Sequence, residues 1–234
     1  MIEKFESVVL NTIKYGESSK IAHLYTKNNG TLSVLAKGAF KPKSKFAGSL
    51  QPLMHVEAKV YFNKNRNIHT ISDLEIVKNR SMIFKNNENL GLSLISCELI
   101  KLTQEEGQVN TDLFDSLVEL LENINLNNNK YESQLNFIMR LIDLSGFGIS
   151  KKINNGNYFS TKKGKFYLEG PMTHYLNDEL VLKFKNLING NSSDIEKAEY
   201  NKIFQLLINY LSYHMERRIN LKSIYLLDLD YSTF

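Results

Sequence analysis

The sequence has little cysteine, no tryptophan and no long apolar run, and these absences exclude several classes of protein. Cys97 is the one cysteine among 234 residues, which excludes a disulfide within the chain and a zinc site built from the cysteines of one chain. No stretch reaches the roughly 18 uninterrupted apolar residues that a membrane-spanning helix needs. With 42% hydrophobic and 23% charged residues, the composition is typical of a globular protein, and we expect a cytoplasmic one.

Motifs that carry known enzyme chemistry are also missing. Residues 38–44 resemble a phosphate-binding loop, but the second glycine before Lys-Ser is absent and Pro42 stiffens the backbone. The five histidines lack the spacing of metal ligands. Cys97 lies among apolar residues of an expected helix, a pattern typical of a buried and inert thiol. We therefore predict that the protein is not an enzyme and has no catalytic residue, bound metal or cofactor.

Positive charge is concentrated at the start of the chain. The net charge of the whole chain is +4, yet residues 1–80 hold 13 Lys/Arg against 6 Asp/Glu, whereas residues 81–234 hold 16 against 19. A basic first third suggests contact with a polyanion such as nucleic acid. A solvated surface with a chance asymmetry of charge explains the same numbers.

Short segments of the first third have the composition of β-strands. They lie at about 6–14, 19–27, 30–37, 53–62 and 68–77. Asn29-Gly30 is a strong hairpin signal because both residues tolerate positive φ. Five strands with a longer connection after the third predict an OB-fold barrel over residues 1–80, although an SH3-like barrel fits the pattern nearly as well.

The pattern changes to helical spacing after residue 80, so we predict an α+β protein whose second domain, residues 81–234, is mostly helical. Helices are expected at about 90–102, 111–124, 131–145 and 194–215, with a last one beginning near Asn220. Thr111 is the expected N-cap of the second helix, and Ser193 or Asp194 that of the fourth. The periodicity disappears at about 151–175, which predicts a small β-like insertion.

The most informative stretch is the connection between the third and fourth expected strands. It places four lysines among phenylalanines: Lys37, Phe40, Lys41, Lys43, Lys45 and Phe46. Lysines neutralise phosphates and exposed rings stack on unpaired bases, so we interpret this stretch as a DNA-binding loop. The alternative is a solvated basic loop whose phenylalanines plug the barrel, and this alternative is strong for Phe46. Further candidates for DNA binding lie at turns: Lys14, Lys20, Lys64 and Arg66.

Several motifs of the first 80 residues resemble the RecO family of recombination and repair proteins. They are Tyr15-Gly16-Glu17-Ser18-Ser19-Lys20, Thr26, Gly30, Ala36-Lys37-Gly38, Ser44-Lys45-Phe46-Ala47-Gly48 and Leu50-Gln51-Pro52. Weaker similarity continues at 141–148 and 213–223, so the resemblance covers nearly the whole chain.

This resemblance implies a function and a set of partners. The first domain would be an OB fold that binds single- and double-stranded DNA. The protein would anneal complementary strands and partner with RecR. It would also bind the C-terminal tail of the single-stranded DNA-binding protein (SSB) and help load RecA. Its expected location is the nucleoid. An acidic and aromatic tail needs an apolar groove with a basic rim. Candidates for that rim, each equally explained as an ordinary surface charge, are Arg140, Lys202, Arg217 and Arg218.

The insertion departs from the family pattern. Many members carry four cysteines of a zinc-ribbon-like site there, whereas residues 151–175 contain none. Asn154, Asn155, Thr173 and Tyr175 of this range do not replace thiolates as the ligands of a tetrahedral zinc site. We therefore expect a degenerate insertion without metal.

Three other functions remain open at this stage. An OB module that binds RNA would use the same barrel and loop, because discrimination by the 2′-OH leaves no simple mark in a sequence. A protein-binding scaffold would use the basic loop to meet an acidic partner. An unrecognised hydrolase would show itself only in a screen for activity.

Overall fold

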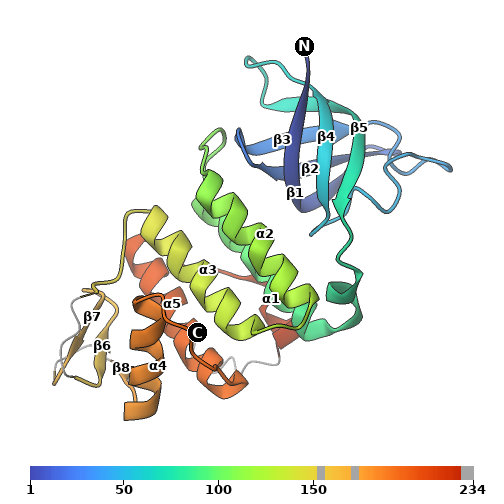
Figure 1. Cartoon of the computed structure of the whole chain (residues 1–234). Helices are drawn as coiled ribbons and strands as arrows, with labels where there is room; N and C mark the ends of the chain where they lie inside the picture. Colours follow the sequence, from blue (N-terminus) through green and yellow to red (C-terminus); the bar gives the residue numbers. More distant parts are fainter. Residues whose placement is uncertain (152–155, 170–173, 228–234) are drawn as a thin grey trace.

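The first 80 residues fold into a closed barrel of five strands (Figure 1). The computed structural model describes residues 1–151, 156–169 and 174–227. The strands are β1 (Ile2–Tyr15), β2 (Ser19–Thr26), β3 (Gly30–Ala36), β4 (His55–Tyr61) and β5 (Ile68–Lys78). All five predicted strands are confirmed, and β1 begins earlier than expected because its first residues pair with the end of β4.

The strand order decides between the two barrel types. Neighbouring strands follow the order β1-β2-β3-β5-β4, and β4 returns to pair with β1. β5 lies beside β3 in parallel, with Ser33 opposite Ile68, while the other pairs are antiparallel. This Greek-key closure is that of the OB fold, so the SH3-like alternative is wrong.

Alternate side chains of the strands fill the barrel. The interior includes Phe5, Val9, Leu24, Leu32, Val34, Val56, Val60 and Ile71. From the connection between β3 and β4, Phe46 and Leu50 join this core and are only 4% and 1% exposed. Phe46 is therefore a plug of the barrel and not a surface for bases, as the alternative interpretation of that residue proposed.

The second part of the chain is mostly helical, as predicted. Its longer helices are α1 (Asn87–Thr103), α2 (Thr111–Asn125), α3 (Lys130–Leu144) and α5 (Lys197–His214). Two elements were not predicted: the short 3-10 helix η1 (Ser81–Lys85) and the helix α4 (Asp178–Ile188). The helix expected near Asn220 is a 3-10 helix, η2 (Lys222–Leu227). No described helix is long and apolar enough to cross a membrane.

The predicted caps of two helices were wrong by one to three positions. Asn110, not Thr111, caps α2, and its Oδ1 accepts a hydrogen bond from the Leu113 amide at 3.0 Å. Glu196, not Ser193 or Asp194, caps α5, because Glu199 can then reach back to the Glu196 amide in a capping box. In both cases the polar residue that reaches the free amides of the first turn marks the start of the helix.

The predicted insertion is a small antiparallel sheet. Its strands β6 (Tyr158–Ser160), β7 (Lys165–Tyr167) and β8 (His174–Tyr175) follow the order β7-β6-β8. Asn154, Asn155 and Thr173 lie outside the described residues. Within the parts of the chain that the structure describes, no group of three His, Cys, Asp or Glu could hold a metal ion. The absence of zinc stays a prediction.

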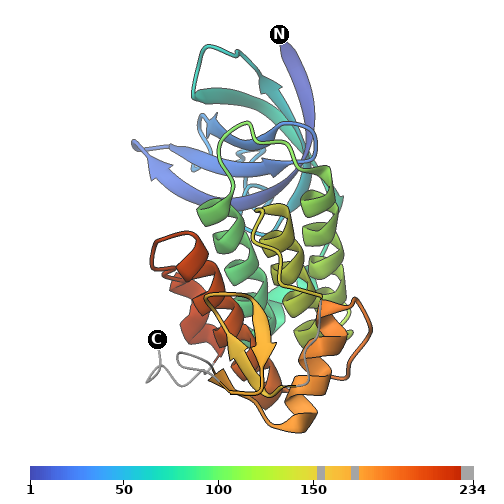
Figure 2. The same ribbon diagram turned by 90° about the vertical axis from the view of Figure 1, so that its left-hand side faces the viewer.

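The barrel packs against one end of the helices, and the small sheet lies at the opposite end of the molecule (Figures 1 and 2). Val8, Leu10 and Tyr25 from the outside of the barrel belong to the same buried cluster as the helices. The Tyr25 ring packs 6.0 Å from that of Phe114 on α2, and its hydroxyl donates to the Asn110 carbonyl at 3.3 Å. These contacts fix the orientation of the barrel relative to the helices.

A buried polar network completes this junction. Arg80 follows β5, and its side chain is 3% exposed and lies 3.4 Å from the Glu122 carboxylate of α2. His55 Nε2 and Glu6 Oε1 are 3.0 Å apart, and the Arg80 guanidinium approaches His55 Nδ1 at 3.5 Å. The buried His55 and Arg80 side chains at the base of the barrel thus each lie beside a carboxylate.

Candidate nucleic-acid interface

The structure divides the basic residues of the barrel into two groups. Those that form ion pairs with carboxylates are Lys4, Lys27, Lys45, Lys59, Lys78 and Arg80. Those without an ion-pair partner among the described residues are Lys14, Lys20, Lys37, Lys41, Lys43, Lys64 and Arg66. Every member of the second group was a predicted DNA-binding residue. Lys45 is the one predicted residue in the first group, 3.8 Å from Asp73.

The connection between β3 and β4 holds its lysines on the surface of the barrel. Lys37, Lys41 and Lys43 are exposed, whereas Ala39 between them and Phe46 after them are buried. Gly38 and Lys43 have positive φ values of 69° and 63°, which keeps the segment in tight turns. The buried residues anchor the loop, and the intervening side chains therefore project into solvent. We call residues 37–45 the basic loop.

Phe40 extends the basic loop toward the turn between β1 and β2. Its amide donates to the Ser18 carbonyl at 2.9 Å, and its ring is 49% exposed. The Lys20 ammonium lies 4.8 Å from the centre of the ring. Lys20 is also directly opposite Lys14 in the β1–β2 ladder. The fold therefore brings Lys14 and Lys20 together with Phe40 and the lysines of the basic loop.

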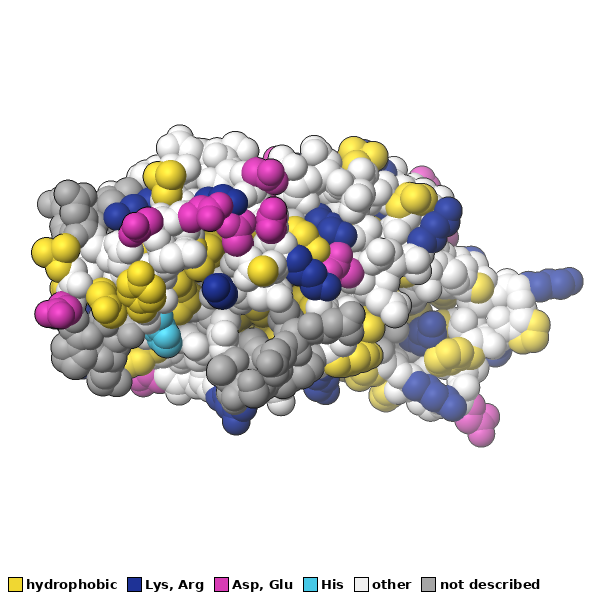
Figure 3. All heavy atoms as spheres, turned by 90° about the horizontal axis from the view of Figure 1, so that it is seen from below, with side chains coloured by type: hydrophobic (Ala, Val, Ile, Leu, Met, Phe, Trp, Pro, Cys, Tyr) yellow, Lys and Arg dark blue, Asp and Glu magenta, His cyan; other side chains and the backbone are white. Residues whose placement is uncertain are grey.

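This end of the molecule projects from the body. In Figure 1 the connection between β3 and β4 extends at the right, and in Figure 3 Lys and Arg side chains gather at the right-hand end. Glu17 of the β1–β2 turn, between Lys14 and Lys20 in the sequence, is an exposed acidic residue close to these cations. The surface thus combines cations, an exposed ring and access from solvent, which is what contact with single strands requires.

Lys64 and Arg66 lie elsewhere on the barrel. They belong to the β4–β5 connection beside the N-terminus, where the Met1 amine donates to the Phe62 carbonyl. Both line a cavity of about 330 Å³ together with His69. Glu106, from the connection between α1 and α2, reaches the same cavity. The structure therefore does not bring these two cations together with the basic loop.

The predicted partner-binding residues also separate. Arg217 and Arg218 follow α5 and line one cavity of about 570 Å³. Arg140 instead pairs with Asp112 at 2.9 Å and lines a smaller cavity of about 250 Å³. Lys202 is exposed on α5 and lines neither cavity.

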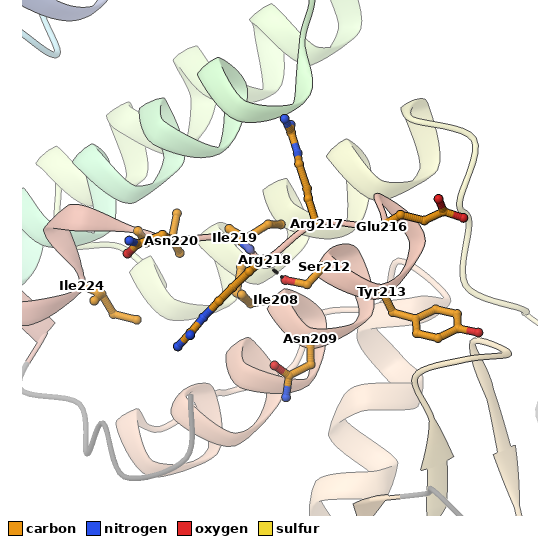
Figure 4. Close-up of a pocket in the computed structure, with 11 residues that line it drawn as sticks. Ile208, Asn209, Ser212, Tyr213, Glu216, Arg217, Arg218, Ile219, Asn220 and Ile224 are labelled. Carbon is orange, nitrogen blue, oxygen red and sulfur yellow. Dashed lines mark hydrogen bonds between the residues drawn. The ribbon is translucent and has the colours of Figure 1, made fainter.

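The cavity beside Arg217 and Arg218 has an apolar floor. Ile208, Ile219, Leu221 and Ile224 contribute that floor. Figure 4 shows the two arginines pointing in opposite directions from the segment after α5, with Ile219 tied back to Ser212 by an amide–hydroxyl hydrogen bond of 3.3 Å. The sequence missed the cavity because its isoleucines have the spacing of core residues, and only the adjacent arginines signal a rim.

Cys97 has the environment expected of an inert thiol. It is 1% exposed in α1, and burial raises its pKa to about 12. A thiol of this kind is protonated at neutral pH and is a poor nucleophile.

Comparison with known proteins identifies the family. Residues 1–80 match the family model described as "Recombination protein O N terminal", and residues 86–223 match "Recombination protein O C terminal". The DNA repair protein RecO of Chloroherpeton thalassium is 28% identical over 243 residues, which cover 92% of this chain and 94% of that protein. That of Caldanaerobacter subterraneus subsp. tengcongensis is 27% identical over 236 residues, covering 91% and 93%. That of Salinibacter ruber is 32% identical over 125 residues, covering 53% and 48%.

These matches cover both halves of the chain in order, and they agree with a barrel followed by helices. They confirm the predicted RecO resemblance and the prediction of a DNA repair and recombination mediator that is not an enzyme. The chain belongs to the RecO family.

Proposed function

We propose that the protein binds DNA through the basic loop, including Phe40, together with Lys14 and Lys20. The observation that carries this proposal is the concentration of cations without ion-pair partners around one exposed aromatic ring. Ion pairs elsewhere on the barrel already neutralise most of its other lysines. The cations of this surface are therefore the ones available to replace the counterions of a phosphate backbone.

Contacts of this type suit a mediator that anneals strands. Lysines contact phosphates of single- and double-stranded DNA alike, whereas Phe40 stacks only on a base that is not in a duplex. Neutralising phosphates lowers the repulsion between two complementary strands as they approach. Lys45 contributes less than its neighbours because Asp73 already attracts its ammonium. Lys64 and Arg66 supply a separate phosphate contact at the other end of the barrel.

We propose the cavity beside Arg217 and Arg218 as the site for the tail of SSB. Family membership implies interactions with DNA, RecR and SSB in general. An acidic tail with an aromatic end matches an apolar floor of isoleucines and a rim of two arginines that have no ion-pair partner among the described residues. Docking there would bring strands coated by SSB to the protein before RecA is loaded. Arg140 is a weaker candidate because Asp112 occupies its guanidinium.

The DNA site is tested with two variants that lose the same charge. One replaces Lys37, Lys41, Lys43 and Lys45 with Ala, and the control replaces the ion-paired Lys4, Lys27, Lys59 and Lys78 with Ala. Binding of a fluorescent single strand of about 30 nucleotides is measured at several salt concentrations, where each lost phosphate contact lowers the slope of log K against log salt by up to about 0.7. We expect the basic-loop variant to lose affinity and slope and the control, checked by thermal unfolding, to keep both.

Other outcomes assign other functions. Equal loss in both variants means that net charge rather than the basic loop controls binding. Wild-type binding without salt dependence contradicts the proposal and favours the protein-binding scaffold. A matched RNA strand that competes better than DNA favours the RNA-binding alternative.

A further inference from the structure

The small sheet carries a row of tyrosines that the proposed function does not use. Tyr158 in the central strand β6 is directly opposite Tyr167 of β7 and Tyr175 of β8. The three side chains therefore form one row across the sheet. The rings of Tyr158 and Tyr175 are 5.4 Å apart at an angle of 59°.

The other face of the sheet is buried, which leaves the tyrosine row outside. Phe159 and Phe166, next along β6 and β7, are 0% and 2% exposed. Their rings lie 5.2 and 5.7 Å from that of Phe184 on α4. Successive side chains of a strand alternate between faces, so the tyrosines point away from this core. Tyr175 is accordingly 63% exposed, while Tyr158 and Tyr167 are half-buried by their neighbours.

Lysines lie beside the end of the row that Tyr167 forms. Lys162 and Lys163 form the turn between β6 and β7, and Lys165 begins β7 on the same face as Tyr167. All three are exposed and have no ion-pair partner among the described residues. The Lys163 ammonium lies 6.0 Å from the centre of the Tyr167 ring. Glu169 is the one acidic residue between 156 and 169.

We propose that this outer face of the small sheet is a second binding site for single-stranded DNA. The tyrosines would stack on unpaired bases, and Lys162, Lys163 and Lys165 would contact the backbone. Rings set among lysines are the combination that binds single strands without regard to sequence, because every base has a face on which to stack. A duplex hides those faces, so the site selects single strands, unlike the basic loop. That the ligand is DNA rests on the proposed function. The tyrosines and lysines of the sheet are not part of the proposed DNA site on the barrel.

The position of the site has a consequence for annealing. The small sheet and the barrel lie at opposite ends of the molecule (Figures 1 and 2). In Figure 3, hydrophobic side chains, a class that includes tyrosine, gather at the left-hand end, where Figure 1 places the sheet. Two short strands can therefore be held at once, one at each end. An oligonucleotide of about 8 nucleotides should bind with a stoichiometry of two, since single-strand sites of this type accept roughly 4–16 nucleotides.

The first experiment locates the strand directly. A single strand carrying 5-iodouracil is irradiated in complex with the full chain, and cross-linked peptides are identified by mass spectrometry. Stacked rings should give cross-links at Tyr158, Tyr167 or Tyr175 in addition to Phe40. Cross-links at Phe40 alone overturn the inference and leave the proposed function standing. Cross-links at the tyrosines alone support the inference and contradict the proposed role of Phe40.

The second experiment measures the contribution of the rings. The test variant combines Tyr167→Ala with Tyr175→Ala in the background that lacks the four basic-loop lysines. The control in the same background is Tyr225→Ala, which removes a 66% exposed tyrosine of η2. We expect single-strand affinity to fall at least about tenfold with unchanged duplex affinity, and Tyr167→Phe with Tyr175→Phe to retain binding. Unchanged single-strand affinity, an equal loss for duplex, or a loss in the phenylalanine variant overturns the inference.

Discussion

Replacing Phe40 with Ala separates stacking from charge at the proposed DNA site. The ring is 49% exposed, with the Lys20 ammonium 4.8 Å from its centre. The ammonium and the ring belong to the same surface, so a base stacked on Phe40 would lie close to a cation. The substitution removes the stacking surface but no charge.

The expected loss follows from these two facts. Stacking of one base on an aromatic side chain is worth about 1–3 kcal/mol by substitution with alanine, which corresponds to a roughly 5- to 150-fold loss of affinity. The cation–π contact that is lost with the ring contributes only about 0.5–1 kcal/mol at an exposed site and is present in the free protein too. The number of counterions released is unchanged, so the slope of log K against log salt should equal that of wild type.

Fluorescence anisotropy with a single strand at four salt concentrations measures both quantities. Phe84→Ala is the matched control, because Phe84 of η1 is 42% exposed and lies outside the proposed site. Phe40→Trp should bind at least as tightly as wild type, since it offers a larger ring. A slope reduced as far as in the four-lysine variant would show that Phe40 only positions the basic loop, and a loss below about twofold would refute stacking.

Two further predictions concern the junction between barrel and helices. Glu122→Ala leaves the buried Arg80 without its carboxylate. The expected loss of about 3 kcal/mol in the free energy of unfolding lowers Tm by roughly 6–12 °C. Arg80→Met with Glu122→Gln should recover most of that stability, and a double variant as unstable as Glu122→Ala would show that the unpaired arginine is not the cause. Burial, and secondly the charge of Arg80, lower the pKa of His55 below 6.5 despite its contact with Glu6. As pH falls, the histidine therefore takes up a proton more readily in the unfolded chain than in the folded one. The free energy of unfolding should then decrease as pH drops below about 6.5. Urea unfolding at about pH 7.5 and pH 5.5 should show a smaller decrease in His55→Gln than in wild type, and an equal decrease would refute the assignment.

The barrel was predictable because its strands alternate apolar and polar residues and are separated by turn signals. What the sequence did not decide was the parallel pairing of Ser33 with Ile68, since register between distant strands is a tertiary property. The missed helix α4 did carry a local signal. Asn177 caps it through the Leu180 amide, and Asp178 and Glu179 occupy its first turn. This signal is hard to read in the sequence because it follows directly on the irregular insertion.

The candidate site was predictable as a set of residues but not as a surface. Lysine spacing in residues 37–45 indicated a loop, and the structure adds which lysines are already paired. Asp73, which attracts Lys45, comes from β5, a contact between segments that sequence spacing does not reveal. For the same reason Lys64 and Arg66, which looked equivalent to Lys20 in the sequence, lie in a different part of the barrel.

Local features that cost stability converge on the proposed DNA surface. Lys14 and Lys20 are directly opposite in a β ladder, where like charges repel. Lys43 has a φ of 63° without being glycine, and Phe40 exposes half of its ring. Elsewhere on the barrel, most lysines form ion pairs with carboxylates. Proteins break such local rules mainly at functional sites. Binding of a polyanion with exposed bases would offset these three costs, so Lys14, Lys43 and Phe40 should each become better ordered when DNA binds.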